Sequence, residues 1–339
     1  MVMKALVTGG GGFLGKALTR LLLAEGHATR VFELPSVNTA VLAELGAEVI
    51  SGDLRDPQAV EKACQGMEVV FHVASLASPW GPGRLFDAIN VTGAENVIAA
   101  CRLHRVPRLV YTSSPSAIFD GTDQRGLDES VPYPTRFTSH YGRTKALAEQ
   151  KVLAAHGPDL ATTAIRPHVI WGPGDNHLFP RLLKRALAGK LQIIGTGQNL
   201  IDVTHVEDAA RAHLLAAQSQ RPAGKAYFVS QGRPVSLWSL VSTILEKVGI
   251  EPPRRKVPYP VAKAAALLIE VVWAAGRLKG EPPFTRYIVD ELARDHYYNI
   301  SRARADLGFE PRVTTESGQQ SFVDWIQNEL LPKPEPAGQ

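Results

Sequence analysis

Short runs of apolar, β-branched residues alternate with longer segments of helical periodicity over the first two thirds of the chain. Runs of this length are typical of strands buried on both faces, and the helical segments are long enough to serve as crossover connections. The alternation predicts an α/β fold with a doubly wound parallel sheet covered by helices on both sides. The predicted strands are 4–8, 29–33, 48–51, 69–73, 108–112 and 161–165, and the predicted helices are 13–25, 57–64, 84–104 and 140–156.

The pattern becomes less regular after residue 175, where proline and glycine interrupt helical segments and short strands. We therefore divide the chain into a first domain, 1–175, and a smaller, mostly helical, ligand-binding region, 176–330. A strand and a helix near 200–230 are expected to return to the first domain, and 331–339 to form a disordered tail. Open α/β sheets bind ligands beyond the carboxyl ends of their strands, so the second region should close over that edge.

The composition is that of an ordinary globular protein, with 339 residues, 45% of them hydrophobic and 21% charged, and a formal net charge of +4. No block of five like charges occurs, so we expect no nucleic-acid partner. Cys64 and Cys101 fall in helical segments as small core residues, which suits a reducing compartment. The chain starts directly with a predicted strand rather than a signal peptide, and we expect a cytoplasmic protein.

The most apolar segment is PVAKAAALLIEVVWAAGRL, residues 260–278. Lys263 and Glu270 interrupt it, and it is short for a transmembrane span. Two interpretations stay open, an ordinary buried or lid helix and an interfacial helix that makes peripheral contact with a membrane.

Four consecutive glycines follow the first predicted strand, in VTGGGGFLGK at 7–16. Gly10, Gly12 and Gly15 spell G-x-G-x-x-G, while Gly9, Gly12 and Gly15 spell G-x-x-G-x-x-G. Both patterns indicate a tight turn that leads into a helix whose first N–H groups face a pyrophosphate, as in a Rossmann-type dinucleotide-binding domain. Glycines also serve purely conformational purposes, but their place between a strand and a helix favours the dinucleotide.

Glu33, at the end of the second predicted strand, is placed to accept hydrogen bonds from the adenosine ribose of NAD. It would repel the 2′-phosphate of NADP, and no Arg or Lys follows at 34–41, so NAD is favoured over NADP. The alternative is a solvated glutamate at a strand end. Asp53 and Leu54, after the third strand, are expected to flank the adenine, or else to form a turn before the next helix.

Three further residues carry the chemistry of the predicted site: Ser114 in YTSSPS, and Tyr141 and Lys145 in SHYGRTKALAEQ. Tyr141 and Lys145 are four residues apart, so they share one face of a helix. A phenol with an ordinary pKa near 10 is a poor base at neutral pH, and a nearby ammonium is expected to bring that pKa down. The serine hydroxyl can bond to a substrate oxygen that changes between alcohol and carbonyl. This set predicts hydride transfer with a nicotinamide cofactor.

These motifs, with Asn90 in INVTGAENV and RPHVIWGPGD at 166–175, resemble the extended short-chain dehydrogenase/reductase family over nearly the whole chain. The resemblance implies Ser114, Tyr141 and Lys145 as catalytic residues, Gly10 and Gly11 as loop filler, and Asn90 as a stabiliser of helix geometry. It implies the following cofactor-binding residues: Gly9, Gly12, Phe13, Leu14, Gly15, Glu33, Asp53, Leu54, Ala74, Ser113, Tyr141, Lys145, Pro167, His168 and Val169.

Within that family, RLVYTSSPSAIFDG and NLIDVTHVEDAARAHLLAA are similar to the 3β-hydroxysteroid dehydrogenase branch. This branch includes sterol-4α-carboxylate 3-dehydrogenases (decarboxylating) and 2-alkyl-3-oxoalkanoate reductases. Both types act on β-hydroxy or β-keto acids, so the resemblance implies an apolar small-molecule substrate, a sterol or a long-chain acid. It also implies a homodimer formed through the helices at 84–104 and 140–156.

Glu33 favours NAD-dependent oxidation of a 3β-hydroxy group, and a sterol 4-carboxylate is the expected substrate. The β-keto acid so formed loses CO₂ through its enol without a further catalytic residue. The alternatives are NADPH-dependent reduction of a 2-alkyl-3-oxoalkanoic acid in long-chain olefin synthesis, nucleotide-sugar epimerisation, and a non-catalytic dinucleotide sensor. The complete Ser, Tyr and Lys set favours an enzyme, because a sensor has no use for it.

A substrate carboxylate would need a cationic partner, and the sequence offers four candidates without distinguishing among them: Arg84, Arg143, His177 and Arg181. His168 and His205 are expected to be buried, hydrogen-bonded supports, and Asp208 a structural residue near a helix start. No metal site is expected, because no histidines have zinc-ligand spacing beside Cys or Glu.

Overall fold

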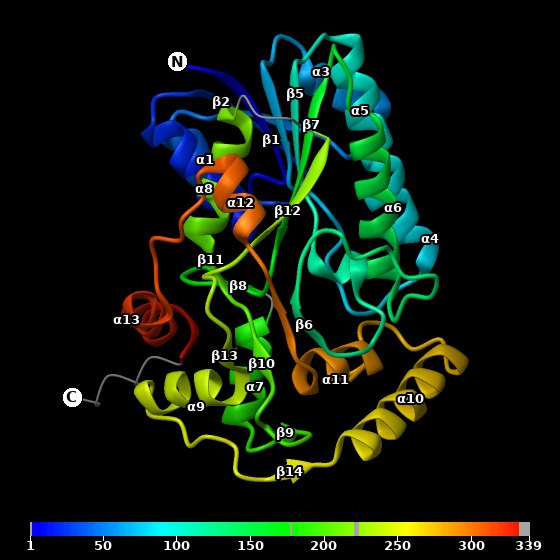
Figure 1. The fold of residues 1–339 in the computed structure, drawn as a ribbon, viewed down its shortest axis with the longest axis vertical. Helices are drawn as coiled ribbons and strands as arrows, with labels where there is room; N and C mark the ends of the chain where they lie inside the picture. The colour runs from blue at the N-terminus through cyan, green and yellow to red at the C-terminus, as the bar shows by residue number, and fades with distance from the viewer. Residues whose placement is uncertain (1, 177, 220–223, 332–339) are drawn as a thin grey trace, which may run out of the picture.

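The computed structural model describes residues 2–176, 178–219 and 224–331. Its centre is a seven-stranded parallel sheet in the order β12-β7-β5-β4-β1-β2-β3, shown in Figure 1. The order reverses next to β1, which is the mark of a doubly wound sheet, and the predicted α/β fold is confirmed. The strands are β1 Lys4–Thr8, β2 Ala28–Glu33, β3 Glu48–Ser51, β4 Val69–His72, β5 Arg108–Thr112, β7 Ala161–Pro167 and β12 Lys225–Val229.

Helices cover both faces of this sheet because its central strands are apolar on both sides. On one face lie α1 (Phe13–Ala24), α8 (Val206–Gln218) and α12 (Ser301–Leu307). On the other lie α3 (Pro57–Cys64), α5 (Gly93–Leu103) and α6 (His140–Ala154), whose apolar residues form a second core against the sheet. The short α2 (Ala40–Glu44) lies at the β2–β3 edge. Cys64 and Cys101 are buried, unpaired members of the second core, as their helical positions predicted.

The predicted helix at 84–104 contains an irregularity that periodicity did not indicate. Its first turn, α4 (Gly83–Phe86), passes into a π-helical turn, Asp87–Thr92, before α5 begins. Asn90 in that turn accepts a hydrogen bond from the backbone N–H of Leu76 and donates to Thr144 Oγ1 on α6. The wider turn is therefore accompanied by a side-chain network that ties α6 to the loop after β4.

The C-terminal region lies beside the carboxyl ends of the sheet and has its own apolar core (Figure 1). A four-stranded sheet, β13-β10-β15-β6, runs through it, and β15 pairs with β6 from the first half of the chain. Residues 298–309 then return to the core beneath α1 and α8. The helices are α7 Leu178–Leu187, α9 Leu237–Lys247, α10 Tyr259–Ala275, α11 Arg286–Ala293 and α13 Thr315–Trp325, and the small strands are β6 Gln124–Leu127, β8 Ile170–Trp171, β9 Ile193–Ile194, β10 Leu200–Ile201, β11 Thr204–His205, β13 Val235–Ser236, β14 Lys256–Val257 and β15 His296–Tyr298.

Two sequence expectations concern the ends of this region. The strand and helix near 200–230 correspond to β12, which pairs with β7, and to α8, which packs on α1. The expected tail falls almost wholly on residues 332–339, which lie outside the described residues, while Leu331 packs against the C-terminal core.

Candidate active site

The glycine loop between β1 and α1 brings the backbone close to itself and to β4. Gly9 has φ +69°, and a Cβ there would lie 2.7 Å from Ala74 Cα. A Cβ on Gly15 would lie 2.0 Å from the carbonyl oxygen of Gly9, so only glycine fits. No side chain caps α1, and its first N–H groups, which begin at Phe13 and Leu14, suit an anion. The loop therefore fits the pyrophosphate of a dinucleotide.

Gly10 and Gly11 are not loop filler, which corrects the expectation from the sequence. A Cβ on Gly10 would lie 2.7 Å from the Val31 side chain, and one on Gly11 would lie 2.6 Å from Val37. The loop packs against the end of β2 so tightly that all four consecutive glycines have steric reasons to be glycine.

Glu33 stands at the end of β2 beside this loop. Its carboxylate accepts hydrogen bonds from the backbone N–H groups of Gly11 and Leu34, each at 2.9 Å. These contacts hold a half-buried negative charge next to the glycine turn, where the sequence places the adenosine ribose. The alternative of a freely solvated glutamate does not describe this side chain.

Asp53 and Leu54 lie past the end of β3, on the same edge of the sheet. The Asp53 carboxylate accepts hydrogen bonds from the Arg55 guanidinium at 2.9 Å, and this bond holds the pKa of Asp53 below its usual range. Leu54 is buried against Gly93. The cap of α3 is Asp56, not Asp53.

Ser114, Tyr141 and Lys145 come together between β5 and α6. Ser114 caps the short 3-10 helix Pro115–Ile118, Ser139 caps α6, and the hydroxyls of Ser114 and Tyr141 interact. Lys145 Nζ donates to the Thr112 carbonyl at 2.7 Å and lies 5.9 Å from the centre of the Tyr141 ring. The sequence-predicted set is thus assembled at the carboxyl edge of the sheet.

The electrostatics of this pair differ from the sequence expectation. Burial raises the pKa of Tyr141 to about 12, although the bond to Ser114 opposes the rise. Burial also lowers the pKa of Lys145 to about 7, against the attraction of Glu149. An ammonium that is only half charged at neutral pH and that bonds to a backbone carbonyl does not bring the pKa of the phenol into the neutral range. Tyr141 therefore rests as the protonated phenol.

The remaining predicted cofactor residues lie along the ends of β5 and β7. Ser113 is buried, and its hydroxyl has no hydrogen-bond partner among the described residues. Pro167 ends β7, and Val169 has φ +37°, a strained conformation for a β-branched residue. His168 Nε2 bonds to His296 Nδ1 at 2.5 Å, and burial holds the pKa of His168 well below its usual value. His168 is buried as predicted, and so is His205, which caps α8.

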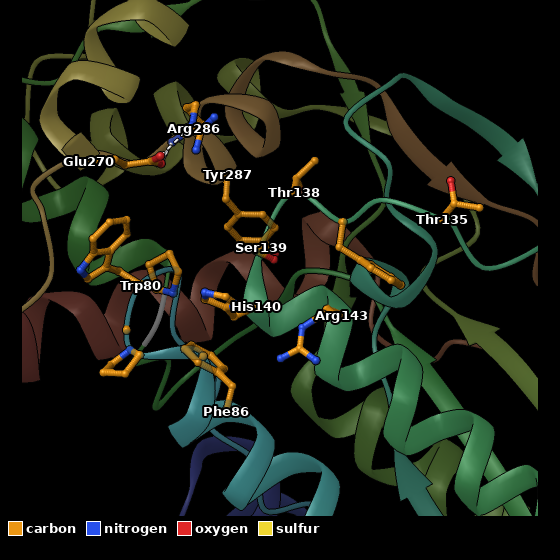
Figure 2. A pocket seen from close by; sticks show the side chains of 15 residues that line it. Trp80, Phe86, Thr135, Thr138, Ser139, His140, Arg143, Glu270, Arg286 and Tyr287 are labelled. Carbon is orange, nitrogen blue, oxygen red and sulfur yellow. Dashed lines mark hydrogen bonds and ion pairs between the residues drawn. The ribbon is translucent and has the colours of Figure 1, made fainter. Parts of the chain in front are cut away.

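A cavity of about 580 Å³ opens between the loop after β4, the start of α6, and α10 and α11. Ser139 and His140, which precede Tyr141 in the chain, line it, whereas Ser114, Tyr141 and Lys145 themselves do not. Figure 2 shows aromatic side chains around it, with Tyr287 directed from α11 toward Ser139 and His140. This wall could not be predicted from the sequence, because α11 lies far along the chain and carries no recognised motif. The aromatic residues that line the cavity are Trp80, Phe86, Phe137, His140 and Tyr287.

Two arginines line the cavity, and both are ion-paired. Arg143 binds both oxygens of Asp87 at 2.8 Å, and Arg286 Nε binds Glu270 at 2.6 Å, as Figure 2 shows for the second pair. Arg143 was among the predicted carboxylate partners, whereas Arg286 was not. Arg181 pairs with Glu281 at 2.8 Å, Arg84 does not line the cavity, and His177 lies outside the described residues.

Among the described residues, no group of three or more His, Cys, Asp or Glu side chains has the arrangement of a metal site. Asp208 instead accepts hydrogen bonds from the backbone N–H groups of Arg312 and Val313, both at 2.9 Å. It is a structural residue in the first turn of α8, as predicted.

Comparison with known proteins decides the family. The model of the 3-beta hydroxysteroid dehydrogenase/isomerase family matches residues 6–260. The chain belongs to this family. The predicted resemblance is confirmed, and so is the enzyme class, an NAD(P)-dependent short-chain dehydrogenase/reductase acting on CH–OH.

Two curated relatives show the range of activities in the family. The 2-alkyl-3-oxoalkanoate reductase of Stenotrophomonas maltophilia is 45% identical over 93% of this chain and 97% of its own length. The human sterol-4-alpha-carboxylate 3-dehydrogenase, decarboxylating, is 36% identical over 94% of this chain and 87% of its own length. Both relatives align with this chain over nearly its whole length.

Solved structures agree with the fold and the cofactor type. The crystal structure of gox2253 superimposes with a TM-score of 0.79 at 26% identity, over 96% of this chain and 98% of that one. MoeE5, solved in complex with UDP-glucose and NAD, gives a TM-score of 0.76 at 25% identity, over 97% of this chain and all of the other. NAD is bound by a protein of this architecture, in line with the predicted cofactor.

Proposed function

We propose that this enzyme interconverts a β-keto acid and a β-hydroxy acid with NAD(H), and that its substrate is a 2-alkyl-3-oxoalkanoic acid. The observation that carries the proposal is the Ser114–Tyr141–Lys145 set, with a cavity of aromatic walls at the first turn of the same helix, where Ser139 and His140 line it. The 45% identity to a 2-alkyl-3-oxoalkanoate reductase supports the choice of acid. A bound nicotinamide dinucleotide would supply or accept the hydride.

In this mechanism Ser114 and Tyr141 bind the substrate oxygen and Tyr141 exchanges the proton. The hydroxyl groups of Ser114 and Tyr141 interact with each other, so both can bond to one carbonyl oxygen as it becomes an alcohol. Lys145 donates a hydrogen bond to the Thr112 carbonyl, and in this proposal it also holds the nicotinamide ribose of the bound dinucleotide. Lys145 is buried and Ser114 and Tyr141 are half-buried, so their bonds lie partly out of water, which strengthens them.

The carboxylate at the edge of the dinucleotide site supports NAD over NADP. Glu33 is fixed by two backbone N–H groups and cannot turn away without losing both. A 2′-phosphate at that position would meet a like charge. We therefore propose NADH as the reductant, although the sequence analysis associated the oxoalkanoate reduction with NADPH.

A second candidate is the oxidation of a sterol 4-carboxylate, with loss of CO₂ from the β-keto acid. The 36% identity to the human decarboxylating dehydrogenase favours it. The volume of the cavity does not distinguish the two proposed substrates, because about 580 Å³ lies within the ordinary range for small-molecule sites. In both candidates a substrate carboxylate would have to compete with Asp87 for Arg143 or with Glu270 for Arg286.

The outer face of α10 supports a peripheral membrane contact, which we include in the proposal. Leu268 is 65% exposed, and the neighbouring apolar side chains on this helix are also exposed to solvent: Leu267, Val271 and Val272. Two cations, Arg277 and Lys279, follow the helix and match an anionic lipid surface. Glu270, on the inner face of α10, lines the substrate cavity. No helix among the described residues has the length and hydropathy to cross a bilayer.

Sedimentation with anionic vesicles tests this contact. We expect the wild-type protein to pellet with phosphatidylglycerol vesicles and the double variant Leu268→Ser/Val272→Ser to remain in the supernatant. Equal pelleting of both proteins would contradict it.

A homodimer through α5 and α6 is likewise proposed from the family resemblance. The two helices lie next to each other on one face of the sheet (Figure 1), and Leu103 at the end of α5 is exposed. Light scattering of the purified protein measures the mass directly, and a monomer at all concentrations would reject this arrangement.

The substrate assay offers the purified protein a 2-alkyl-3-oxoalkanoic acid with NADH or NADPH, and a sterol 4-carboxylate with NAD⁺. We expect loss of NADH absorbance and a 3-hydroxy acid in the first mixture. CO₂ release from the sterol acid alone would establish the second candidate. Binding of UDP-glucose with turnover of neither acid would favour the epimerase alternative, and NADH binding without any turnover would favour the sensor.

A further inference from the structure

A row of hydroxyl groups leads from the catalytic tyrosine to a carboxyl group on α11. Tyr141 interacts with Ser114, and Ser114 Oγ donates to Ser116 Oγ at 3.1 Å. Ser116 Oγ lies 3.0 Å from the hydroxyl of Tyr287, which in turn interacts with the carboxyl of Glu291. Hydrogen bonds join Ser114 to Ser116 and Ser116 to Tyr287, and electrostatic contacts of Tyr141 with Ser114 and of Tyr287 with Glu291 extend this row at its two ends.

Local structure explains why these groups face each other. Ser114 and Ser116 lie in the turn that begins the 3-10 helix Pro115–Ile118, where Ser114 also accepts from the Ser116 N–H. Thr285 caps α11, and Tyr287 and Glu291 are four residues apart on it, so they share a face. The adjacent Asp290 faces the other way and binds Tyr259 at 2.9 Å as well as Lys263. The ion pair between Asp290 and Lys263, which anchors α11, is therefore separate from the row of hydroxyl groups.

We propose that Ser116, Tyr287 and Glu291 form a proton relay that exchanges protons between Tyr141, through Ser114, and Glu291. The proposal rests on the proposed oxidoreductase function, because that reaction changes the protonation of Tyr141 in every turnover. Glu291 does not line the cavity and acts through other residues, so it is a positioning residue for the proton. Tyr287 lines the cavity as well, so Glu291→Gln is the variant that separates the relay from substrate contact.

The proton balance closes in both directions. In reduction the carbonyl carbon gains a hydride from reduced nicotinamide, and its oxygen gains the phenolic proton of Tyr141. Ser114 then gives its proton to the phenolate and takes one from Ser116, which takes one from Tyr287, which takes one from Glu291. Solvent protonates the Glu291 carboxylate again. In oxidation each transfer is reversed, and hydroxyl groups can rotate to serve as donor or acceptor.

Glu291 is suited to the end of such a relay. Enclosure by protein raises its pKa, and Asp290 adds to the rise, while His296 and Tyr287 oppose it. Tyr141 on α6 and Tyr298 on β15 also face its charge. His296 is held by His168 and by the backbone oxygen of Glu291, at 2.8 Å for the second bond. Because its pKa is raised above the ordinary value, Glu291 holds a proton more readily than an exposed glutamate does, which suits it to supply a proton to the row of hydroxyl groups.

The test compares Glu291→Gln and Tyr287→Phe with Glu246→Gln, an exposed residue on α9 that serves as the control. Glutamine keeps the shape of Glu291 and can bond to Tyr287, but it cannot exchange a proton. We expect kcat to fall about 10-fold in Glu291→Gln with KM within about 2-fold, and the acid limb of the kcat–pH profile to disappear. An unchanged kcat and pH profile, or a change in KM alone, would overturn the proposal.

Infrared titration provides a readout that does not depend on turnover. We expect the wild-type protein to show a carboxyl band that titrates at a higher pH than that of an exposed glutamate, and that is absent in Glu291→Gln and shifted in Tyr287→Phe and Tyr141→Phe. If neither acid is turned over but these bands appear, the substrate assignment fails and the relay stands. If the band is absent, or insensitive to Tyr141→Phe, the relay fails whatever the substrate.

Discussion

At the scale of single residues, burial shifts the pKa values of two ionisable groups in the site toward their neutral forms. The pKa of Tyr141 is raised to about 12 and that of Lys145 is lowered to about 7. Both shifts oppose the phenolate–ammonium pair at neutral pH. Catalysis must therefore move the Tyr141 proton at the moment of reaction rather than start from a standing phenolate.

Removing the phenol should separate chemistry from binding. We expect Tyr141→Phe to lower kcat by about 10²- to 10⁴-fold, because proton transfer is lost while the ring still packs. The dissociation constant for NADH, measured by fluorescence titration, should stay within about 2-fold of the wild-type value. Turnover at the wild-type rate would show that another group moves the proton.

The burial of Lys145 predicts a pH-dependent stability. Its folded pKa of about 7 lies below the ordinary 10.5, so the unfolded chain binds more protons between these values, and stability from this group rises with pH across that window. We expect Lys145→Met to have a higher unfolding midpoint than the wild type at pH 7 and to lose that advantage toward pH 10. Calorimetry at the two pH values measures it, and a difference that does not vary with pH would contradict the assignment.

Glu33 predicts the cofactor preference. Glu33→Gln keeps one acceptor for the Gly11 N–H but removes the charge that repels a 2′-phosphate. We expect NADPH to bind about 10-fold more tightly to the variant, a change of about 1.4 kcal/mol, with a smaller loss for NADH. If the NADPH dissociation constant did not change, Glu33 would not face the ribose.

Residues with a strong local signal could be predicted, and those without one could not. Gly15, Tyr141 and Lys145 are specified by spacing within one turn or one helix. Tyr287 and Glu291 belong to the same site, but they approach Tyr141 only because α11 folds back over it. Their pairing depends on tertiary contacts, which periodicity and motifs do not contain.

At the scale of elements, the glycine loop and α1 form the most constrained piece. We expect Gly15→Ala to abolish measurable dinucleotide binding and to lower the unfolding midpoint, because the new Cβ would meet the Gly9 carbonyl at 2.0 Å. Gly157→Ala is the matched control, since a Cβ there meets no atom within 4 Å. A Gly15→Ala protein that bound NADH normally would show that the loop can move aside at little cost.

Most strands and helices of the first 165 residues match their predicted bounds to within one or two residues. Strong apolar periodicity, glycine turns and capping residues define them. The π-helical turn around Asn90 was not predicted, because it depends on the bonds of that amide to Leu76 and Thr144. The packing of Gly10 and Gly11 against β2 was not predicted either, because it too depends on contacts between segments that are separate in the sequence.

At the scale of the whole molecule, the active site is assembled from three distant parts of the chain. The parallel sheet supplies the dinucleotide edge, the β5–α6 segment supplies the catalytic set, and α10 and α11 close the cavity. The pairing of β15 with β6 and the return of 298–309 to the core hold α11 in register with the sheet. The sequence predicted the class of this architecture, whereas the closing wall required long-range strand pairing that no local pattern encodes.

The central claim is that hydride reaches the β-carbon of a β-keto acid under the control of Tyr141. The most direct test is mass spectrometry of the product formed from a 2-alkyl-3-oxoalkanoic acid with each of the two C4-deuterated epimers of NADH. The account predicts a 3-hydroxy acid one mass unit heavier from one epimer only, and almost no product from Tyr141→Phe. Product without deuterium from either epimer, or equal product from the variant, would contradict it.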